Sequence, residues 1–472
     1  MRRNGDSVCD LTIILMSSST AQIPPPPPIL SPERYGGESA APVWSYVPTL
    51  ALVRGFCYAF VMLTSATFFK SIGLENSVIG YLSLLSLPAS LKFLWAPVAD
   101  SYGKKRNWAL AAGYSHVACV AAMAFVLCQT PLPIGLLIFF FSLCALVYGV
   151  SDFASDGFFV CAAPPAARQA GIVLLTAFSR GSIALLSGVI FCAGFFSDRF
   201  HSLNQGWAAA LGILAGGVLL LTLYNNFSLP RPVADQPARP EGGSVPWGKI
   251  FASYSETPRF WVVMAYLMTL RLGENLVMRM SQVFFIESSA KGGLGLSLQQ
   301  ISFVSASSLA AMIAGGVLSM AIIKKFSVRR TMIPLTLAML TPNVLYLLLA
   351  LFPSPAGINF LLAEHNLHLS QVALVSTVHC IEHLGYGLGF TFYFSVTVAL
   401  AHGKYRASHM AFGNAVMLLG VILPNSVGGL VQEMIGWPGL FLVAVLCCIP
   451  GFWLTFYLPA AVIDTDQPGA TN

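Results

Sequence analysis

The chain is built from long apolar runs separated by short polar breaks. An apolar run of about 20 residues can cross a bilayer as one helix. Division at the polar, glycine and proline breaks gives twelve such runs. The predicted spans are 46–68, 77–98, 107–128, 133–158, 169–195, 206–226, 259–285, 299–323, 331–352, 371–399, 408–431 and 437–459. This pattern predicts an all-α integral membrane protein.

The polar segments divide these spans into two groups of six. The longest interior polar stretch, RPVADQPARPEGGSVPWGK, follows the sixth span. We therefore expect one six-helix half at 45–226, a central linker at 227–258 and a second six-helix half at 259–460. The Ser-, Gly- and Pro-rich composition of residues 1–44 favours a disordered tail. Residues 461–472 form a second tail.

The two halves share short features in the same order, which indicates a parallel duplication. Each half also carries a basic loop after its second span, GKKR in the first and KKFSVRR in the second. Two six-helix halves describe a major-facilitator transporter, whose substrate site lies between the halves near mid-membrane. The matching features are Tyr148-Gly149 with Tyr386-Gly387, Arg168 with Arg406, and Gly206-Trp207 with Gly436-Trp437.

Composition excludes several other classes of protein. Hydrophobic residues make up 56% of the chain and charged residues 9%, whereas a soluble domain carries roughly 25% charged residues. The ten cysteines show no CxxC or His/Cys ligand spacing, so we interpret them as small buried residues without a metal. No GxxxxGK[ST], GxSxG or HExxH motif is present. We therefore expect a gradient-driven transporter without a cofactor, not an enzyme.

The net charge of +6 reflects topology. Fourteen Lys and Arg residues lie in the loops after spans 2, 4, 6, 8 and 10, against three in the loops on the other side. Cytoplasmic loops carry the excess of basic residues. This asymmetry predicts that both termini and the central linker are cytoplasmic. It also explains the positive net charge without a nucleic-acid partner.

Nine charged residues fall inside the predicted spans. In a major-facilitator arrangement the first helix of each three-helix unit lines the central cavity, and seven of the nine lie on those four helices. Charges within a membrane normally face the bundle interior or a wet cavity. They therefore mark the predicted pathway. The nine are Arg54, Lys92, Arg180, Arg271, Arg279, Asp152, Asp156, Glu274 and Glu382.

The two aspartates of SDFASDG share one helical face, because they are four residues apart. They could pair with Lys92 or a cytoplasmic-side arginine as a structural gate. They could instead carry a proton, since burial and a like charge disfavour ionisation. Asp152 lies deeper in its span and is the better candidate for proton coupling. Asp156 suits an ion-pair gate, together with Lys92 and Asp100.

The second half offers two further candidates for proton coupling. Glu274 follows Arg271 by three residues and could form a self-satisfied ion pair with it. Glu382 has His379 one turn before it and His383 beside it. Such histidines are usually hydrogen-bonded core residues. Glu382 has no cation adjacent in sequence, so it is the harder of the two to explain structurally.

Three of the embedded arginines are candidates for binding an anionic substrate. The guanidinium groups of Arg54, Arg180 and Arg271 could form bidentate hydrogen bonds with a carboxylate. They could equally neutralise Asp152 and Glu382. Residue patterns alone do not separate these roles.

The remaining embedded groups have weaker signals. Arg279 is nearer the outer end of its span, where a long cationic side chain can extend to the interface. Tyr58 and Tyr386 could stack on a sugar ring. Aromatic residues in membrane helices more often face lipid or core.

Several stretches resemble AmpG-type permeases. IGYLSLLSLPASLKFLWAPVADSYGKKRNWAL is similar to the second and third helices of that family. SDFASDGFFV resembles the family's QDIxxDAxxxxxL element, which places Asp152 and Asp156 on its two aspartates. RQAGIVLLTAFSRGSIALLSG resembles a further element and places Arg180 on its mid-helix arginine. The likeness covers nearly all of residues 45–460.

The resemblance implies proton-coupled import of cell-wall turnover fragments across a bacterial inner membrane. These are anhydro-muropeptides or N-acetylglucosaminyl-anhydromuramic acid, carried by a monomer in the bilayer. Span 1 reads RGFCYAFVMLTSATFF where the family has a GFxSGLPxxL pattern, which weakens the substrate assignment more than the fold. The alternative is a major-facilitator permease for another anionic solute, such as a siderophore, nucleotide-sugar, acyl-CoA or oligosaccharide. A non-transporting receptor or scaffold would not need charges on four cavity helices.

The predicted topology can be tested at the central linker. A cysteine in place of Pro240 should react with an impermeant thiol reagent only after cells are permeabilised, because the linker is cytoplasmic. Labelling of this cysteine in intact cells would overturn the topology.

Overall fold

The computed structural model describes residues 42–92, 102–164, 167–233, 235–236, 258–354, 370–399 and 406–459. Every secondary-structure element in these ranges is a helix, which confirms the predicted all-α fold. Nearly all of the predicted N-terminal tail, most of the central linker, the C-terminal tail and the candidate gate residue Asp100 lie outside the described residues.

The first half begins with a helix whose middle is π-helical. α2 (Val43–Ala59), the π-helical turn η2 (Phe60–Thr64) and α3 (Ser65–Ser71) follow one another directly. The second span is divided into α4 (Asn76–Tyr81), the 3-10 segment η3 (Leu82–Ser86) and α5 (Leu87–Ser90). Pro88 lies in the first turn of α5, where its missing N–H breaks no helical bond. The other helices are α7 (Lys105–Leu127), α8 (Ile134–Ala162), α9 (Arg168–Phe200) and α10 (Leu203–Ser228).

The second half contains one interrupted span, and its last element consists of two helices that meet at a kink. The seventh span is broken at Arg271, whose backbone leaves helical geometry at φ −100° and ψ 10°. α19 bends at Gly436, where φ is +74°, a value that glycine adopts without a steric penalty. The helices are α12 (Phe260–Thr269), α13 (Leu272–Ile286), η5 (Ser289–Lys291), α14 (Leu298–Phe326), α15 (Val328–Leu340), α16 (Asn343–Leu351), α18 (Gln371–Ala399) and α19 (Arg406–Thr455).

Eight of the described helical segments are long and apolar enough to cross a membrane. The longest, Phe412–Thr455, contains most of both the eleventh and the twelfth predicted spans. Three predicted spans are absent from the eight. The described parts of the second and seventh are divided into shorter helices, whereas the tenth is the unbroken helix Gln371–Ala399. The chain is therefore a multi-pass membrane protein.

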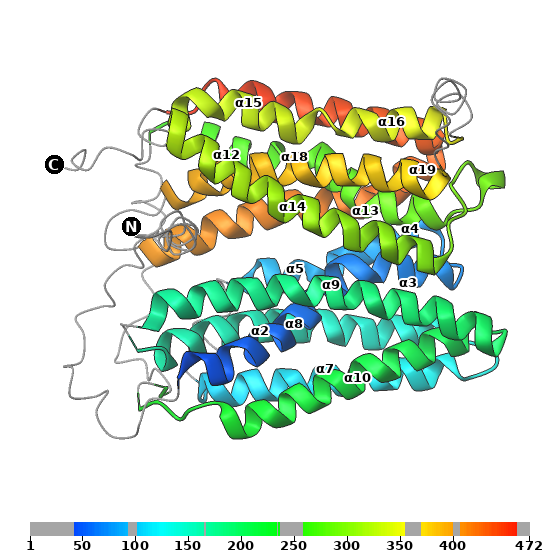
Figure 1. The fold of residues 1–472 in the computed structure, drawn as a ribbon, viewed down its shortest axis with the longest axis vertical. Helices are drawn as coiled ribbons and strands as arrows, with labels where there is room; N and C mark the ends of the chain where they lie inside the picture. Colours follow the sequence, from blue (N-terminus) through cyan, green and yellow to red (C-terminus); the bar gives the residue numbers. More distant parts are fainter. Residues whose placement is uncertain are drawn as a thin grey trace, which may run out of the picture.

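The helices form two bundles (Figure 1). Helices α2 to α10 make one bundle and helices α12 to α19 the other. The bundles contact each other where α4 meets α19, α9 meets α14 and α3 meets α13. The first bundle ends with α10 at Ser228 and the second begins with α12 at Phe260.

The same aromatic pair closes the core of each half. The ring centroids of Phe68 and Trp207 are 5.0 Å apart, and those of Phe284 and Trp437 are also 5.0 Å apart. All four side chains are buried. Because both tryptophans belong to the repeated Gly-Trp pairs, the duplication in the sequence is also a duplication in packing.

The bundles meet at the end where α3 and α13 finish, which is the outer end in the predicted topology. Lys70 forms an ion pair with Glu287 across the two halves. Asn76 Nδ2 donates to Gln432 Oε1 at 2.6 Å, also across the halves. We call the region defined by Lys70, Asn76, Glu287 and Gln432 the outer contact. It holds the bundles together by buried polar groups that belong to both.

Direct backbone packing at the outer contact depends on Gly429. A Cβ atom added to Gly429 would lie 1.7 Å from the carbonyl oxygen of Asn76. No side chain, however small, fits between α19 and α4 at this point. Closure of the outer contact therefore requires glycine here.

We expect Gly429→Ala to open the outer contact. The added methyl group would clash with the backbone of Asn76, which cannot shift without the rest of α4. The measurement is the rate at which an impermeant thiol reagent, added outside, modifies a cysteine placed at Thr64 in the cavity wall. The rate should rise in Gly429→Ala. Gly217→Ala is the control, since a Cβ there meets no atom within 4 Å. Equal rates in both variants would contradict this role of Gly429.

Candidate substrate cavity

A cavity of about 330 Å³ lies between the two halves. Its wall draws on both bundles, as a site between halves requires. Ten of the predicted site residues are described, and six of them line this cavity. Arg54, Asp156, Glu274 and Glu382 do not. The six are Tyr58, Lys92, Asp152, Arg180, Arg271 and Tyr386.

The two aspartates of α8 are joined to two cations from the first half. Arg54, on α2, places Nη2 2.7 Å from Asp152 Oδ1 and Nη1 2.6 Å from Asp156 Oδ1. Lys92, just beyond α5, pairs with the second oxygen of Asp152. The i, i+4 spacing lets one guanidinium bridge both carboxylates. Asp152 is thus held by two cations, and Asp156 by one.

These contacts show which cation pairs with which aspartate in the predicted ion-pair gate. Lys92 pairs with Asp152 and not with Asp156. Arg54 takes the neutralising role that the sequence left open beside substrate binding, since both of its carboxylate partners belong to the protein. The Asp156 side chain is 46% exposed against 14% for Asp152, so Asp152 has the more desolvated ion pairs.

Arg271 sits at the break in the seventh span and is fully engaged by its neighbours. Its Nη2 lies 3.0 Å from Glu274 Oε1 and donates to Asn275 Oδ1 at 3.1 Å. Its guanidinium carbon lies 5.0 Å from the ring centroid of Tyr386 and 5.3 Å from that of Phe390. Glu274 is fully buried. Arg271 and Glu274 therefore form an ion pair with each other, which was one of the alternatives that the sequence offered.

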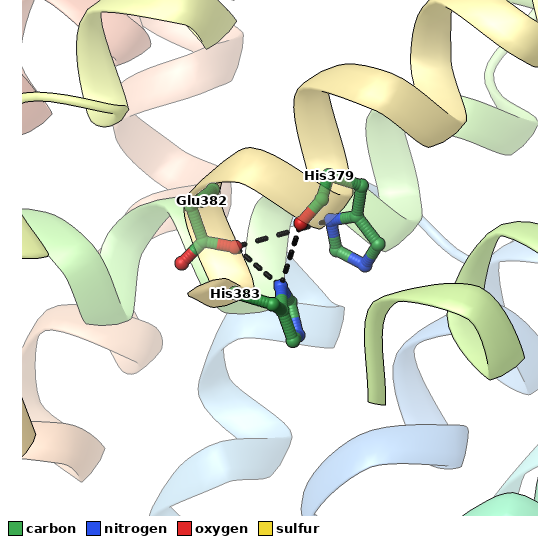
Figure 2. Close-up of side chains that lie close together, drawn as sticks. All are labelled: His379, Glu382 and His383. Carbon is green, nitrogen blue, oxygen red and sulfur yellow. Dashed lines mark hydrogen bonds and ion pairs between the residues drawn. The ribbon is translucent and has the colours of Figure 1, made fainter. Parts of the chain in front are cut away.

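Glu382 is buried on α18 between two histidines (Figure 2). His383 Nδ1 lies 2.5 Å from Glu382 Oε2, and the Nδ1 atom of His379 lies 4.0 Å from the same oxygen. The Tyr346 hydroxyl forms a hydrogen bond of 2.5 Å with His379 Nδ1. Glu382 therefore interacts with imidazole groups rather than with an arginine or lysine.

These three residues also form a group that could hold a metal ion, because their ligand atoms lie within 4.8 Å of one another. This group was not predicted from the sequence. His379 has, however, a packing role: it meets Phe285 with ring centroids 5.3 Å apart, as Phe141 meets Phe69 at 5.0 Å in the first half. The geometry therefore agrees with the hydrogen-bonded core histidine that the sequence favoured.

Arg279 lies where the sequence did not place it. Its side chain was expected to extend to the membrane interface, but the residue is only 5% exposed. Nη1 donates to the carbonyl oxygen of Met62 at 3.2 Å and to Ser65 Oγ at 3.0 Å, and Nη2 donates to the carbonyl oxygen of Ile79 at 3.2 Å. All three acceptors belong to the first half. The expectation was wrong because the first half covers this end of α13.

Two arginines in the cavity wall have no carboxylate partner in the described part of the chain. Arg180, on α9, and Arg279, on α13, both line the cavity. Neither forms an ion pair with a residue that the structure describes, whereas the four predicted acids are all paired with other groups. The cavity therefore carries two positive charges that the described protein does not neutralise.

Sequence reasoning also missed uncharged polar residues of the cavity wall, among them Gln282, Asn414 and Asn425. One signal was available for part of the set. Arg271, Arg279 and Gln282 follow a helical spacing of eight and three residues, which puts them near one face. That spacing gives the face but not the element against which it packs.

Similar proteins are transporters. No protein-family model matches the chain. It is 22% identical over 419 residues to the anhydromuropeptide permease of Escherichia coli K12, covering 86% of this chain and 78% of that protein. It is 20% identical over 435 residues to a putative AmpG 2 transporter of Rickettsia felis, covering 89% and 96%. These relatives confirm the resemblance to AmpG-type permeases and the prediction of a transporter rather than an enzyme.

Solved structures support the fold. A D-xylose–proton symporter matches with a TM-score of 0.64 at 13% identity, covering 89% of this chain and 98% of that one. A nucleoside transporter matches with a TM-score of 0.61 at 12% identity, covering 87% and 98%. At this identity the likeness concerns the fold alone. The chain has the predicted major-facilitator fold.

The ion pairs of Asp152 predict a double-mutant effect on stability. Asp152→Asn should lower the free energy of unfolding by about 2–3 kcal/mol, because Arg54 and Lys92 lose a partly desolvated partner. Lys92→Met should restore part of that loss in the double variant. The measurement is denaturant unfolding in mixed micelles, with Asp156→Asn as a more exposed control expected to lose less. Additive effects of Asp152→Asn and Lys92→Met would contradict the coupling.

Proposed function

We propose that this chain is a secondary transporter that imports cell-wall turnover fragments, anhydromuropeptides or N-acetylglucosaminyl-anhydromuramic acid, together with protons. The substrate passes through the cavity between the two halves. The protein acts in the bacterial inner membrane as a monomer, with both termini in the cytoplasm. The similarity to an anhydromuropeptide permease supports the substrate class.

One observation carries the proposal: Arg180 and Arg279 line the cavity without a described carboxylate partner. A carboxylate that enters a low-dielectric cavity loses several kcal/mol of solvation unless cations receive it. Anhydromuropeptides carry such carboxylates. The two guanidinium groups supply the matching charge, and their planar donors suit a carboxylate.

The rest of the wall suits a sugar with a charged appendage. Tyr58 and Tyr386 line the cavity from opposite halves. The Tyr386 ring is held in place by the guanidinium of Arg271 at 5.0 Å. Aromatic faces of this kind can pack on the apolar face of a pyranose ring. Tyr58 and Tyr386 are therefore proposed to hold the glycan, while the arginines bind the carboxylates.

The geometry around Asp152 offers a route for proton coupling. Asp152 and Lys92 both line the cavity and pair with each other. A proton bound to Asp152 would weaken this pair and release the ammonium group of Lys92 toward an anionic ligand. Proton and substrate would then favour each other's binding. Glu274 and Glu382 remain candidate proton carriers in the second half.

The composition of span 1 favours a second candidate, a permease for another anionic solute such as a siderophore, nucleotide-sugar, acyl-CoA or oligosaccharide. Tyr58, Met62 and Leu63 of this span line the cavity, and they belong to the stretch that departs from the AmpG-type pattern. Competition between substrates separates the two candidates. Both kinds of substrate need cations in the cavity, but only the cell-wall fragments carry the anhydromuramyl glycan.

The test is uptake of radiolabelled anhydromuropeptide into proteoliposomes with an imposed proton gradient. The proposal expects accumulation that a protonophore abolishes and that unlabelled anhydromuropeptide competes away. Failure to take up muropeptide, with uptake of another anionic solute, would favour the second candidate.

Arg180→Lys should weaken binding of anhydromuropeptide, measured by calorimetry on purified protein. Lysine keeps the charge but loses the planar fork, and a charged hydrogen bond contributes roughly 1.5–3 kcal/mol, so Kd should rise about ten- to a hundredfold. An analogue with amidated carboxylates should be indifferent to the change. Arg168→Lys, at the start of the same helix and outside the cavity wall, is the control. An equal loss for both ligands would make Arg180 a structural residue.

A further inference from the structure

Arg279 joins the two halves in an unusual way. It is a buried cation of the second half, and each of its hydrogen-bond acceptors is a neutral oxygen of the first half: the carbonyl oxygens of Met62 and Ile79 and the hydroxyl of Ser65. Its Nε has no hydrogen-bond partner among the described residues. A buried charge is normally paired with an opposite charge. Within the described part of the chain, Arg279 interacts only with neutral dipoles, and it borders the cavity.

The three acceptors lie in or next to segments that depart from α-helical geometry. Met62 belongs to the π-helical turn η2, and Ile79 lies in α4 just before the 3-10 segment η3. Ser65 donates its own hydroxyl proton to the carbonyl oxygen of Val61 at 2.7 Å, which leaves its lone pairs for Arg279. Isolated π-helical turns occur frequently at functional sites. The first half is thus shaped to receive this guanidinium.

All three acceptors belong to the same bundle. They lie on η2, α3 and α4, which belong to the bundle of the first half, whereas Arg279 lies on α13 of the second half. Alternating access moves the two bundles against each other around a fixed site. When the outer contact opens, Arg279 therefore loses all three acceptors at once. Its charge is then exposed at the outer end of the cavity.

We propose that Arg279 is a carboxylate-binding residue of the outward-facing state, where it receives an anionic group of the substrate. As the outer contact closes, the oxygens of Met62, Ser65 and Ile79 replace that carboxylate, which passes to Arg180 deeper in the wall. The inference rests on the proposed function, in that the transported ligand is an anion.

This exchange links ligand binding to conformation. One guanidinium cannot hold both the ligand carboxylate and the acceptors of the first half. An anionic ligand at Arg279 therefore favours the outward-facing state, since a ligand shifts the equilibrium toward the state that it binds better. Transfer of the carboxylate away from Arg279 favours closure. The residue then acts in both states, with a different partner in each.

The experiment combines a distance measurement with a binding measurement. Spin labels on cysteines at Glu75 and Ala290, both exposed at the outer end, report whether the outer contact is open, in a background without reactive native cysteines. The ligands are an anhydromuropeptide with a tripeptide and the same compound with its carboxylates amidated. In wild type the free acid should increase the population with a long distance, and the amidated compound should not.

Two variants separate the roles of Arg279. Arg279→Gln should raise the Kd of the free acid at least about tenfold while leaving that of the amidated compound unchanged, and should abolish the ligand-dependent distance change. Ser65→Ala removes one acceptor and keeps the charge. It should increase the open population without ligand and keep or improve affinity for the free acid. If Arg279→Gln does not fold, Arg279→Lys should give a smaller loss of the same selectivity.

The control removes an arginine with a similar bonding pattern inside one half. Arg106 donates to the carbonyl oxygens of Leu229 and Asn226, both in the first half, and does not line the cavity. Arg106→Gln should leave both the distance distribution and the ligand preference unchanged. An Arg279→Gln variant that loses affinity equally for both ligands, or for neither, would overturn the inference and leave Arg279 a structural link.

The experiment also distinguishes an error in the proposed substrate from an error in the role of Arg279. Wild-type protein that binds neither form of the anhydromuropeptide would overturn the substrate assignment. Arg279 is then tested with citrate as a small carboxylate probe. A citrate-dependent increase of the long distance in wild type, absent in Arg279→Gln, would support the role of Arg279. No response of wild type to citrate would overturn it.

Discussion

The membrane requires that each buried charge be compensated, and the arrangement of the cavity follows from that requirement. Asp152 and Asp156 are held by Arg54 and Lys92, and Glu274 is held by Arg271. These pairs stay within one half, so they can persist while the halves move. The charges left without a described counterion lie at the interface between the halves, where a ligand can complete them.

Two similar scaffolds carry different chemistry. The aromatic pairs Phe68–Trp207 and Phe284–Trp437 repeat with the same spacing, so each half is stabilised in the same way. The ionic groups do not repeat. The first half uses carboxylates on α8 bridged by α2. The second keeps the Arg271–Glu274 pair within the broken seventh span and places Glu382 beside His383 on α18. The duplicated packing supplies a cavity on the pseudo-symmetry axis, and the unequal charges make its two walls distinct.

The sequence predicted what is encoded within one helix and missed what depends on a partner helix. The apolar runs gave the all-α fold, and the spacing of Arg271 and Glu274 gave their pair, because residues three apart share a face. The sequence did not decide whether Arg54 binds the substrate or neutralises protein carboxylates, so its bridge to both aspartates was not predicted. The burial of Arg279 was mispredicted, since its acceptors on η2, α3 and α4 are more than 190 residues away in the chain. Periodicity identifies a face, but only packing identifies what covers it.

We propose that the unpaired guanidinium groups of the cavity, and not the paired ones, bind the substrate's carboxylates. An electron cryomicroscopy structure of the chain with bound anhydromuropeptide tests this directly. We expect a ligand carboxylate about 2.7–2.9 Å from the guanidinium nitrogens of Arg180, with Arg54 still bonded to Asp152 and Asp156. A ligand carboxylate bound instead to Arg54, with Asp152 displaced, would contradict the account.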